Sequence, residues 1–136
     1  MPEKSKTGLD TTVVLRLLVG EPVHQYRKAV LFVERQAEAG LELYVSDLVI
    51  AESYFALHFH YEIPKRDVLQ KLHEFLSSGI VQPLPGSVCR KVLQDVQNHK
   101  AGFADQMIHE QYLLSSHQVA TFDRAMSKLA HTLHLD

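Results

Sequence analysis

The sequence predicts an α/β domain with a mainly parallel sheet. Helical and strand-like segments alternate along the chain, no internal repeat or linker-like stretch divides it, and its 136 residues suit one domain. We therefore expect a single domain over residues 1–136, with residues 1–6 as a flexible N-terminal extension. A chain of this length buries roughly two-thirds of its unfolded surface, so it needs no disulfide or structural metal to fold.

The first half of the chain is predicted to alternate short strands with amphipathic helices. Gly20 and Gly40 each follow apolar residues spaced three and four positions apart, which is typical of helix ends. Pro22 favours a helix start, and Ser46 is suited to capping the next helix. These signals predict strands over 6–9 and 41–45, and helices ending at Gly20, running from 22 to 40, running from 46 to before 64, and covering 64–76. The helix after Ser46 is predicted to bury Leu48, Phe55, Ala56 and Phe59.

The second half repeats this alternation. A strand is predicted over 80–84, and the nearby prolines favour the edge of a sheet. Helices are predicted over 87–99, 103–115 and 123–129, and strands over 118–122 and 132–135. Five strands are therefore expected in the whole chain.

Composition limits the classes of function. The chain is 46% hydrophobic and 22% charged, with a formal net charge of −2, so it lacks the basic excess of a broad nucleic-acid binder. No run of 18 apolar residues predicts a membrane span. The single cysteine, Cys89, cannot pair within the chain, and the polar start does not resemble a signal peptide. We expect a cytoplasmic protein.

Two acids follow predicted strands directly. Asp10 and Asp123 each stand between a strand and a helix, and the carboxyl ends of parallel strands share one edge, where ligand sites form. Asp is also a favoured helix cap, so either residue alone is explained by capping. The two roles are compatible.

Glu52 and Asp105 lie within predicted helices. Glu52 is expected on or beside the buried face of its helix, where an unpaired carboxylate is costly; a rim position paired with a lysine or arginine is the alternative. Asp105 lies in a first helical turn, where an acid also interacts well with the helix dipole. Several carboxylates in one crevice need protons or cations between them, and oxygen ligands suit Mg²⁺ or Mn²⁺. This pattern fits phosphodiester hydrolysis.

Four short segments resemble the PIN-domain family, and within it the VapC-type toxins of toxin–antitoxin pairs. They occur in the family's order and span nearly the whole chain: Leu9-Asp10-Thr11-Thr12-Val13-Val14-Leu15, Val49-Ile50-Ala51-Glu52, Gly102-Phe103-Ala104-Asp105 with Ile108, and Ala120-Thr121-Phe122-Asp123-Arg124. Each segment alone is weak, and the ordered set is more specific. The resemblance implies a three-layer α/β/α sandwich with a central, mainly parallel sheet of four or five strands.

The resemblance also implies a site and partners. Asp10, Glu52, Asp105 and Asp123 would bind one or two Mg²⁺ or Mn²⁺ ions and activate water to cut RNA, with Thr11 and Thr121 in supporting positions. A homodimer and a small inhibitory antitoxin are implied partners. The chain departs from the family at Thr12, where asparagine is common, so a hydrogen bond near the site is expected to differ.

Two further residues are candidates for phosphate binding. Arg124 follows Asp123, and its guanidinium suits a phosphate oxygen, although a solvated position at a helix start is the simpler interpretation. His109 lies one helical turn after Asp105, where it would either face the groove or pack in the interior.

Other functions compete with the toxin ribonuclease. A haloacid-dehalogenase-like phosphatase would also place an aspartate after a strand, but it usually has a second aspartate two residues later, where this chain has Thr12. A non-catalytic PIN-like module that binds RNA or protein, and a housekeeping RNA-processing nuclease, are the remaining alternatives.

Overall fold

The computed structural model describes residues 6–115 and 118–135. The chain divides into two compact units, the first ending at Pro85 and the second beginning at Gly86, which we call unit 1 and unit 2. Residues 1–5 of the predicted extension lie outside the described residues, whereas Lys6 begins the first strand. The prediction that residues 1–136 form one domain stays a prediction.

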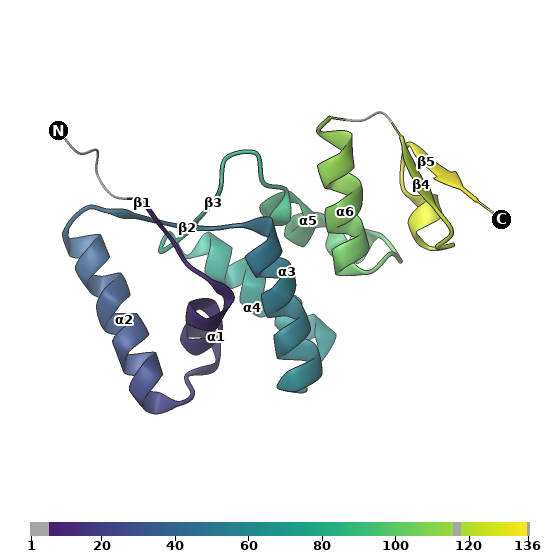
Figure 1. The fold of residues 1–136 in the computed structure, drawn as a ribbon. Coiled ribbons are helices and arrows are strands. Elements are labelled where there is room, and N and C mark those ends of the chain that lie inside the picture. The colour runs from purple at the N-terminus through teal and green to yellow at the C-terminus, as the bar shows by residue number, and fades with distance from the viewer. Residues whose placement is uncertain (1–5, 116–117, 136) are drawn as a thin grey trace. The chain divides into compact units, whose positions relative to one another are not determined.

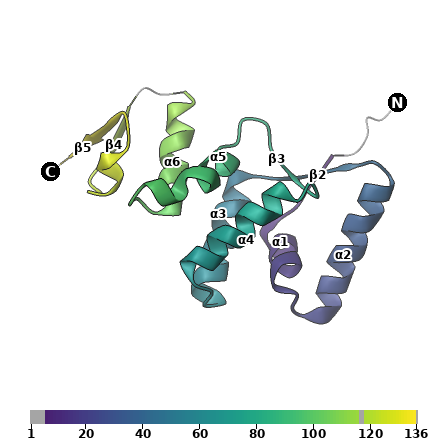
Figure 2. The same cartoon turned by 180° about the vertical axis from the view of Figure 1, so that it is seen from behind.

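Unit 1 contains a three-stranded parallel sheet and its helices (Figures 1 and 2). Its elements are β1 (Lys6–Gly8), α1 (Thr11–Val19), α2 (Val23–Glu38), β2 (Glu42–Val45), α3 (Asp47–Phe55), a π-helix (Ala56–His60), α4 (Lys65–Ser77) and β3 (Gln82–Pro83). The strand order is β1-β2-β3, with Thr7 beside Leu43 and Val45 beside Pro83. Pro83 thus lies in an edge strand of this sheet, as predicted.

The core of unit 1 comes from the strands and from one face of each of several helices. Helix α1 contacts both α2 and α3, and α3 contacts α4. The most deeply buried apolar side chains are Val14, Val45, Ile50, Leu57, Val68, Leu72 and Val81. Gly20 ends α1 in the left-handed conformation, with a φ of 79°, which explains why glycine stands at this turn.

The buried face of α3 differs from the prediction. Leu48, Phe55 and Phe59 are 71%, 45% and 69% exposed, so three of the four residues predicted to face inward lie on the surface. Ile50 and Tyr54 are buried instead, and Leu57 continues their face into the π-helix. Both sets have helical spacing, so the apolar pattern alone did not identify the inner one.

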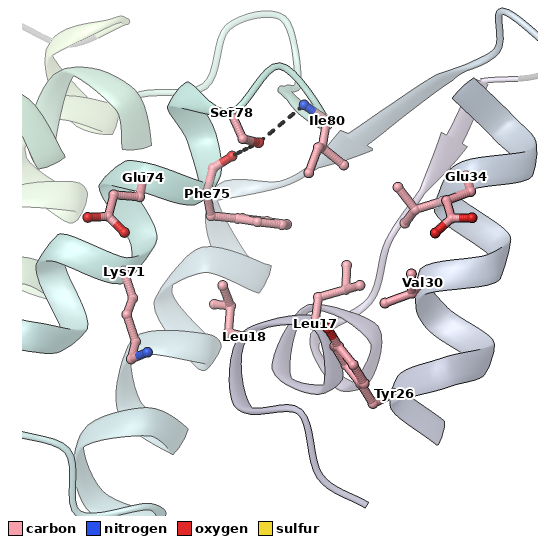
Figure 3. A pocket seen from close by; sticks show the side chains of 11 residues that line it. Leu17, Leu18, Tyr26, Val30, Glu34, Lys71, Glu74, Phe75, Ser78 and Ile80 are labelled. Atoms are coloured by element: carbon pink, nitrogen blue, oxygen red, sulfur yellow. Dashed lines mark hydrogen bonds between the residues drawn. The ribbon is translucent and has the colours of Figure 1, made fainter. Parts of the chain in front are cut away.

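Helix α2 borders an open apolar cleft. All of α2 is described, and Ala29 is its only buried residue. The cleft has a volume of about 510 Å³. Figure 3 shows Tyr26 and Val30 of α2 on one wall and Phe75 of α4 on the other, with Leu17 and Leu18 of α1 between them. Three apolar or aromatic side chains of α2 at helical spacing, Tyr26, Val30 and Val33, therefore line this cleft.

Unit 2 pairs two helices with a small parallel ladder. Its elements are α5 (Cys89–Asp95), a 3₁₀ turn (Val96–Asn98), α6 (Phe103–Leu113), β4 (Val119–Thr121), a second 3₁₀ turn (Met126–Lys128) and β5 (Thr132–His134). Helices α5 and α6 pack together, and β4 pairs with β5 with Ala120 beside Leu133. A small core is formed by Ala101, Val119, Met126 and Leu129.

The predicted α/β class with parallel strands is confirmed. All five predicted strands form, and they are shared between the sheet of unit 1 and that of unit 2. The helix predicted over 123–129 was wrong, because this segment forms only the 3₁₀ turn Met126–Lys128. No helix in the described part of the chain has the length and apolar character needed to cross a membrane.

Candidate active site

Each unit carries two of the four predicted acids. Asp10 and Glu52 belong to unit 1, and Asp105 and Asp123 belong to unit 2. Three of them begin or precede a helix or turn, and Glu52 lies within α3.

Asp10 lies between β1 and α1, as predicted. Leu9 is buried, and its backbone N–H donates to the carbonyl of Tyr44 at 2.8 Å, so the chain leaves the sheet just before Asp10. The Asp10 carboxylate caps α1 by accepting the backbone N–H of Val13 at 3.2 Å. Its side chain is exposed, so the cap also presents a carboxylate to solvent.

Thr12 fixes the Asp10 carboxylate further. The hydroxyl of Thr12 donates to Asp10 Oδ1 at 2.7 Å. This hydrogen bond, followed by the one from the Val13 N–H, holds the pKa of the Asp10 carboxyl below its ordinary value. Asp10 is therefore kept ionised, which suits a metal ligand. At position 12, where the resembling family often has asparagine, the hydroxyl of a threonine therefore supplies a hydrogen bond to Asp10.

Thr11, at the start of α1, contacts Glu52 of α3. The Thr11 hydroxyl donates to Glu52 Oε1 at 2.7 Å, which brings Glu52 beside the residue that follows Asp10. Glu52 is exposed, so the expectation that it lies on or beside the buried face of its helix was wrong. Among the described residues, no lysine or arginine forms an ion pair with it, as the rim alternative had required. It shares the outer side of α3 with Leu48 and Phe55, while Ser53 and Tyr54 point inward. The exposed carboxylate has no desolvation cost to offset.

Asp105 and Asp123 interact in unit 2. Asp105 lies in the first turn of α6, after the N-cap Gly102, and is half-buried. Burial raises the pKa of the Asp105 carboxyl, and the negative charge of Asp123 raises it further. The second cause shows that the two carboxylates are near enough to repel. A cation between them would relieve that repulsion.

Thr121 and Met126 position Asp123 at the end of β4. The backbone N–H of Asp123 donates to the hydroxyl of Thr121 at 2.9 Å. Asp123 Oδ1 accepts the backbone N–H of Met126 at 2.7 Å, which begins the 3₁₀ turn. Thr121 therefore acts through the backbone of Asp123, and its effect on a ligand would be indirect.

His109 lies in the interior of unit 2. It is 4% exposed, and its Nε2 donates to the carbonyl of Ala130 at 2.6 Å, joining α6 to the segment before β5. A buried imidazole with one nitrogen bound in this way favours a structural role over the predicted phosphate contact. Packing against Leu129 and Ala130, which sequence spacing does not reveal, accounts for the difference.

Arg124 remains a candidate for phosphate binding. Its side chain is exposed, and among the described residues no carboxylate forms an ion pair with it. Its backbone carbonyl accepts the hydroxyl of Ser127 at 2.6 Å, which helps to hold the turn after Asp123.

The donor set fits a hard divalent cation. The four candidates offer carboxylate oxygens, which are the ligands that Mg²⁺ and Mn²⁺ prefer. In its described residues, neither unit gathers three or more Asp, Glu, His or Cys side chains that could hold a metal ion. Each unit contains two of the four candidate acids.

Comparison with known proteins adds one result. A family model described as PIN domain matches residues 9–132, which include all four acids and extend over both units. A comparison with curated proteins gives no significant match.

Proposed function

The chain belongs to the PIN-domain family, and from this premise we propose that it is an endoribonuclease that cuts RNA phosphodiester bonds with water and Mg²⁺ or Mn²⁺. PIN domains have an α/β fold, in agreement with the predicted three-layer α/β/α sandwich. They generally act as nucleases. The match over both units supports one nuclease domain.

The observation that carries the proposal is the pairing of carboxylates in each unit. In unit 1, Thr11 ties Glu52 to the start of α1 beside Asp10. In unit 2, Asp123 raises the pKa of Asp105 by repulsion. The repulsion between Asp105 and Asp123 is unfavourable for folding without a cation, and a metal site explains why the chain contains these two neighbouring acids.

Asp10, Glu52, Asp105 and Asp123 would hold the metal. When bound, a divalent cation neutralises these carboxylates, polarises a phosphate and makes a water more acidic. The chain's own groups orient the ligands: Thr12 holds Asp10, and Thr11 holds Glu52. Thr121 sets the backbone at Asp123. Such outer hydrogen bonds keep carboxylates in place before a ligand arrives.

We further propose that the enzyme is a VapC-type toxin controlled by a small antitoxin. The apolar cleft beside α2 supports a protein partner, since an amphipathic helix would cover the side chains that α2 leaves open. We also propose a cytoplasmic location, which agrees with a chain whose single cysteine, Cys89, cannot form a disulfide within the chain.

A homodimer is the second proposed assembly. Leu48, Phe55 and Phe59 form an exposed apolar stripe along α3 and the π-helix, and the rings of Phe55 and Phe59 stack with centroids 6.0 Å apart. Exposed aromatic residues of this kind are enriched in the centres of interfaces. Light scattering should give a dimer mass that falls on Phe59→Glu; a monomer at high concentration would contradict this assembly.

RNA cleavage tests the enzymatic proposal. Purified protein should cut single-stranded RNA with Mg²⁺ or Mn²⁺ and stop when EDTA is added. Asp10→Asn, Glu52→Gln, Asp105→Asn and Asp123→Asn should each lose most of the activity. The exposed acid Asp67 gives a control in unit 1, and Glu110, which pairs with Lys91, gives one in unit 2. Full activity in EDTA, or in any of the four variants, would refute the proposal.

A further inference from the structure

A second pocket of unit 1 lies between α1 and α2. It has a volume of about 280 Å³ and is separate from the apolar cleft at α4. Its lining comes from the two helices: Thr12, Val13, Arg16, Gln25, Lys28 and Ala29. Two of these side chains are cations and none is an acid. The pocket is therefore suited to an anion, although the whole chain has a net charge of −2.

Arg16 is held in place without an acidic partner. Its Nε donates to Gln25 Oε1, which fixes the guanidinium across the gap from α1 to α2. Among the described residues, no carboxylate forms an ion pair with Arg16 or with Lys28. The amide of Gln25 is neutral, so it orients Arg16 and leaves its charge uncompensated. An arginine positioned in this way can still present its Nη groups to a phosphate.

Thr12 joins this pocket to the candidate active site. Thr12 lines the pocket and also donates its hydroxyl to Asp10 Oδ1. Arg16 lies one helical turn after Thr12 on α1, so the pocket extends along this helix from the residue that holds Asp10, which we propose as a metal ligand. An RNA strand whose cut phosphate lies at Asp10 would bring a neighbouring phosphate near this pocket.

We propose that Arg16 and Lys28 form a subsite for an RNA backbone phosphate next to the phosphate that is cut. The inference rests on the proposed ribonuclease function and names residues that bind its substrate. Phosphate contacts of this kind set the position of a strand and carry no sequence information. They also offset, near the site, the net negative charge of the chain.

Salt dependence of RNA binding tests the subsite. In an Asp10→Asn background, which keeps an oxygen to accept the Thr12 hydroxyl, the affinity for a single-stranded RNA oligonucleotide is measured by fluorescence anisotropy at several salt concentrations. Arg16→Ala with Lys28→Ala removes both cations of the subsite, so the contact with one phosphate is lost and the slope of log K against log[salt] should fall by about 0.7, the contribution of one phosphate in single-stranded nucleic acid. Arg16→Lys should keep most of the slope, because the charge remains.

The matched control removes one arginine and one lysine elsewhere in unit 1. Lys65 and Arg66 begin α4 and do not line the pocket. Their double alanine variant should leave the slope close to that of the parent. Lys28→Ala alone serves if the double variant is unstable, because Lys28 is exposed and its loss leaves the Arg16–Gln25 contact intact. The slope of this variant should lie between those of the parent and the double variant.

The possible results distinguish a failure of the subsite proposal from a failure of the ribonuclease proposal. If wild type cuts RNA but the pocket variants keep the parental slope, the subsite is refuted and the ribonuclease stands. If control and pocket variants lose the same slope, the contact is non-specific and the subsite is also refuted. If wild type neither binds nor cuts RNA, both proposals fail. Weaker binding of free phosphate but not of RNA in the pocket variants would assign the pocket to a small anion.

Discussion

The hydroxyl of Thr11 donates a 2.7 Å hydrogen bond to Glu52 Oε1 and so connects the start of α1 to the middle of α3. Thr11→Val keeps the side-chain shape and removes the donor. We expect cleavage to fall about 10- to 100-fold, the range found when partners of metal ligands are lost. Single-turnover cleavage rates measure this effect. Thr11→Ser should restore most of the rate; equal rates in all three proteins would show that the bond does not orient Glu52.

Asp10 combines a structural and a catalytic role, and substitutions should separate them. Asp10→Ala removes the cap of α1 and should lower the free energy of unfolding by about 1 kcal/mol. Asp10→Asn should change stability much less, because asparagine is also a good cap, and should still lose cleavage. Urea unfolding monitored by circular dichroism gives the stabilities. A fully active Asp10→Asn variant would leave Asp10 with the cap alone.

The hydrogen bond from Thr12 to Asp10 should make the stability of the protein depend on pH. Because it lowers the pKa of the Asp10 carboxyl in the folded protein, Asp10 contributes stability above its ordinary pKa of 3.8, and this contribution disappears as the pH falls through the folded value. In Thr12→Val, the pKa of Asp10 should rise towards 3.8. An NMR titration of the Asp10 side-chain carbon measures it, and an unchanged midpoint would contradict the assignment.

For Asp105 in unit 2, the pH dependence of stability should have the opposite sign to that expected for Asp10. Burial and the charge of Asp123 raise the pKa of Asp105, so ionised Asp105 disfavours folding at neutral pH and the cost disappears as the pH falls through the folded value. Asp105→Asn should therefore raise the Tm of the EDTA-treated protein at pH 7 while it abolishes cleavage. A lower Tm at pH 7 would show that Asp105 stabilises the fold instead.

His109 should matter for stability and little for chemistry. His109→Phe leaves the Ala130 carbonyl without its donor in a buried place and should lower the free energy of unfolding by about 1–3 kcal/mol. The cleavage rate per folded molecule, measured well below the Tm, should stay within a few-fold of wild type. A large loss of rate at unchanged stability would restore the predicted phosphate contact.

Local signals in the sequence predicted most of the elements. Gly20 ends α1, Ser46 caps α3 and Pro83 lies in an edge strand, since each depends on backbone chemistry within a few residues. The helix predicted over 123–129 did not form, because a segment of only seven residues is short for a helix, and the 3₁₀ turn Met126–Lys128 forms in its place.

The orientation of α3 was the main error. Ile50, Tyr54 and Leu57 have helical spacing, and so do Leu48, Phe55 and Phe59. Tertiary packing decides between two apolar stripes, and the buried one could not be read from periodicity. The exposure of Glu52 follows from that choice.

The sequence predicted where Asp10 and Asp123 lie relative to the strands and helices, but not the hydrogen bonds that hold the candidate acids. The positions of Asp10 and Asp123 after strands followed from strand and helix signals. The Thr11–Glu52 bond joins residues 41 positions apart, so no local pattern reveals it. Thr12 was noted only as a departure from the family, although a hydroxyl two residues after a capping acid is a signal for a bond to that acid.

Titration with Mn²⁺ alone tests the central claim most directly, because it measures the metal site without RNA. Isothermal titration calorimetry of wild type, Asp10→Asn and Asp105→Asn compares one ligand from each unit. The account predicts that either substitution weakens Mn²⁺ binding at least tenfold, as expected when one of a few carboxylate ligands is lost. Unchanged Mn²⁺ affinity in either variant would contradict the assignment of that carboxylate as a metal ligand.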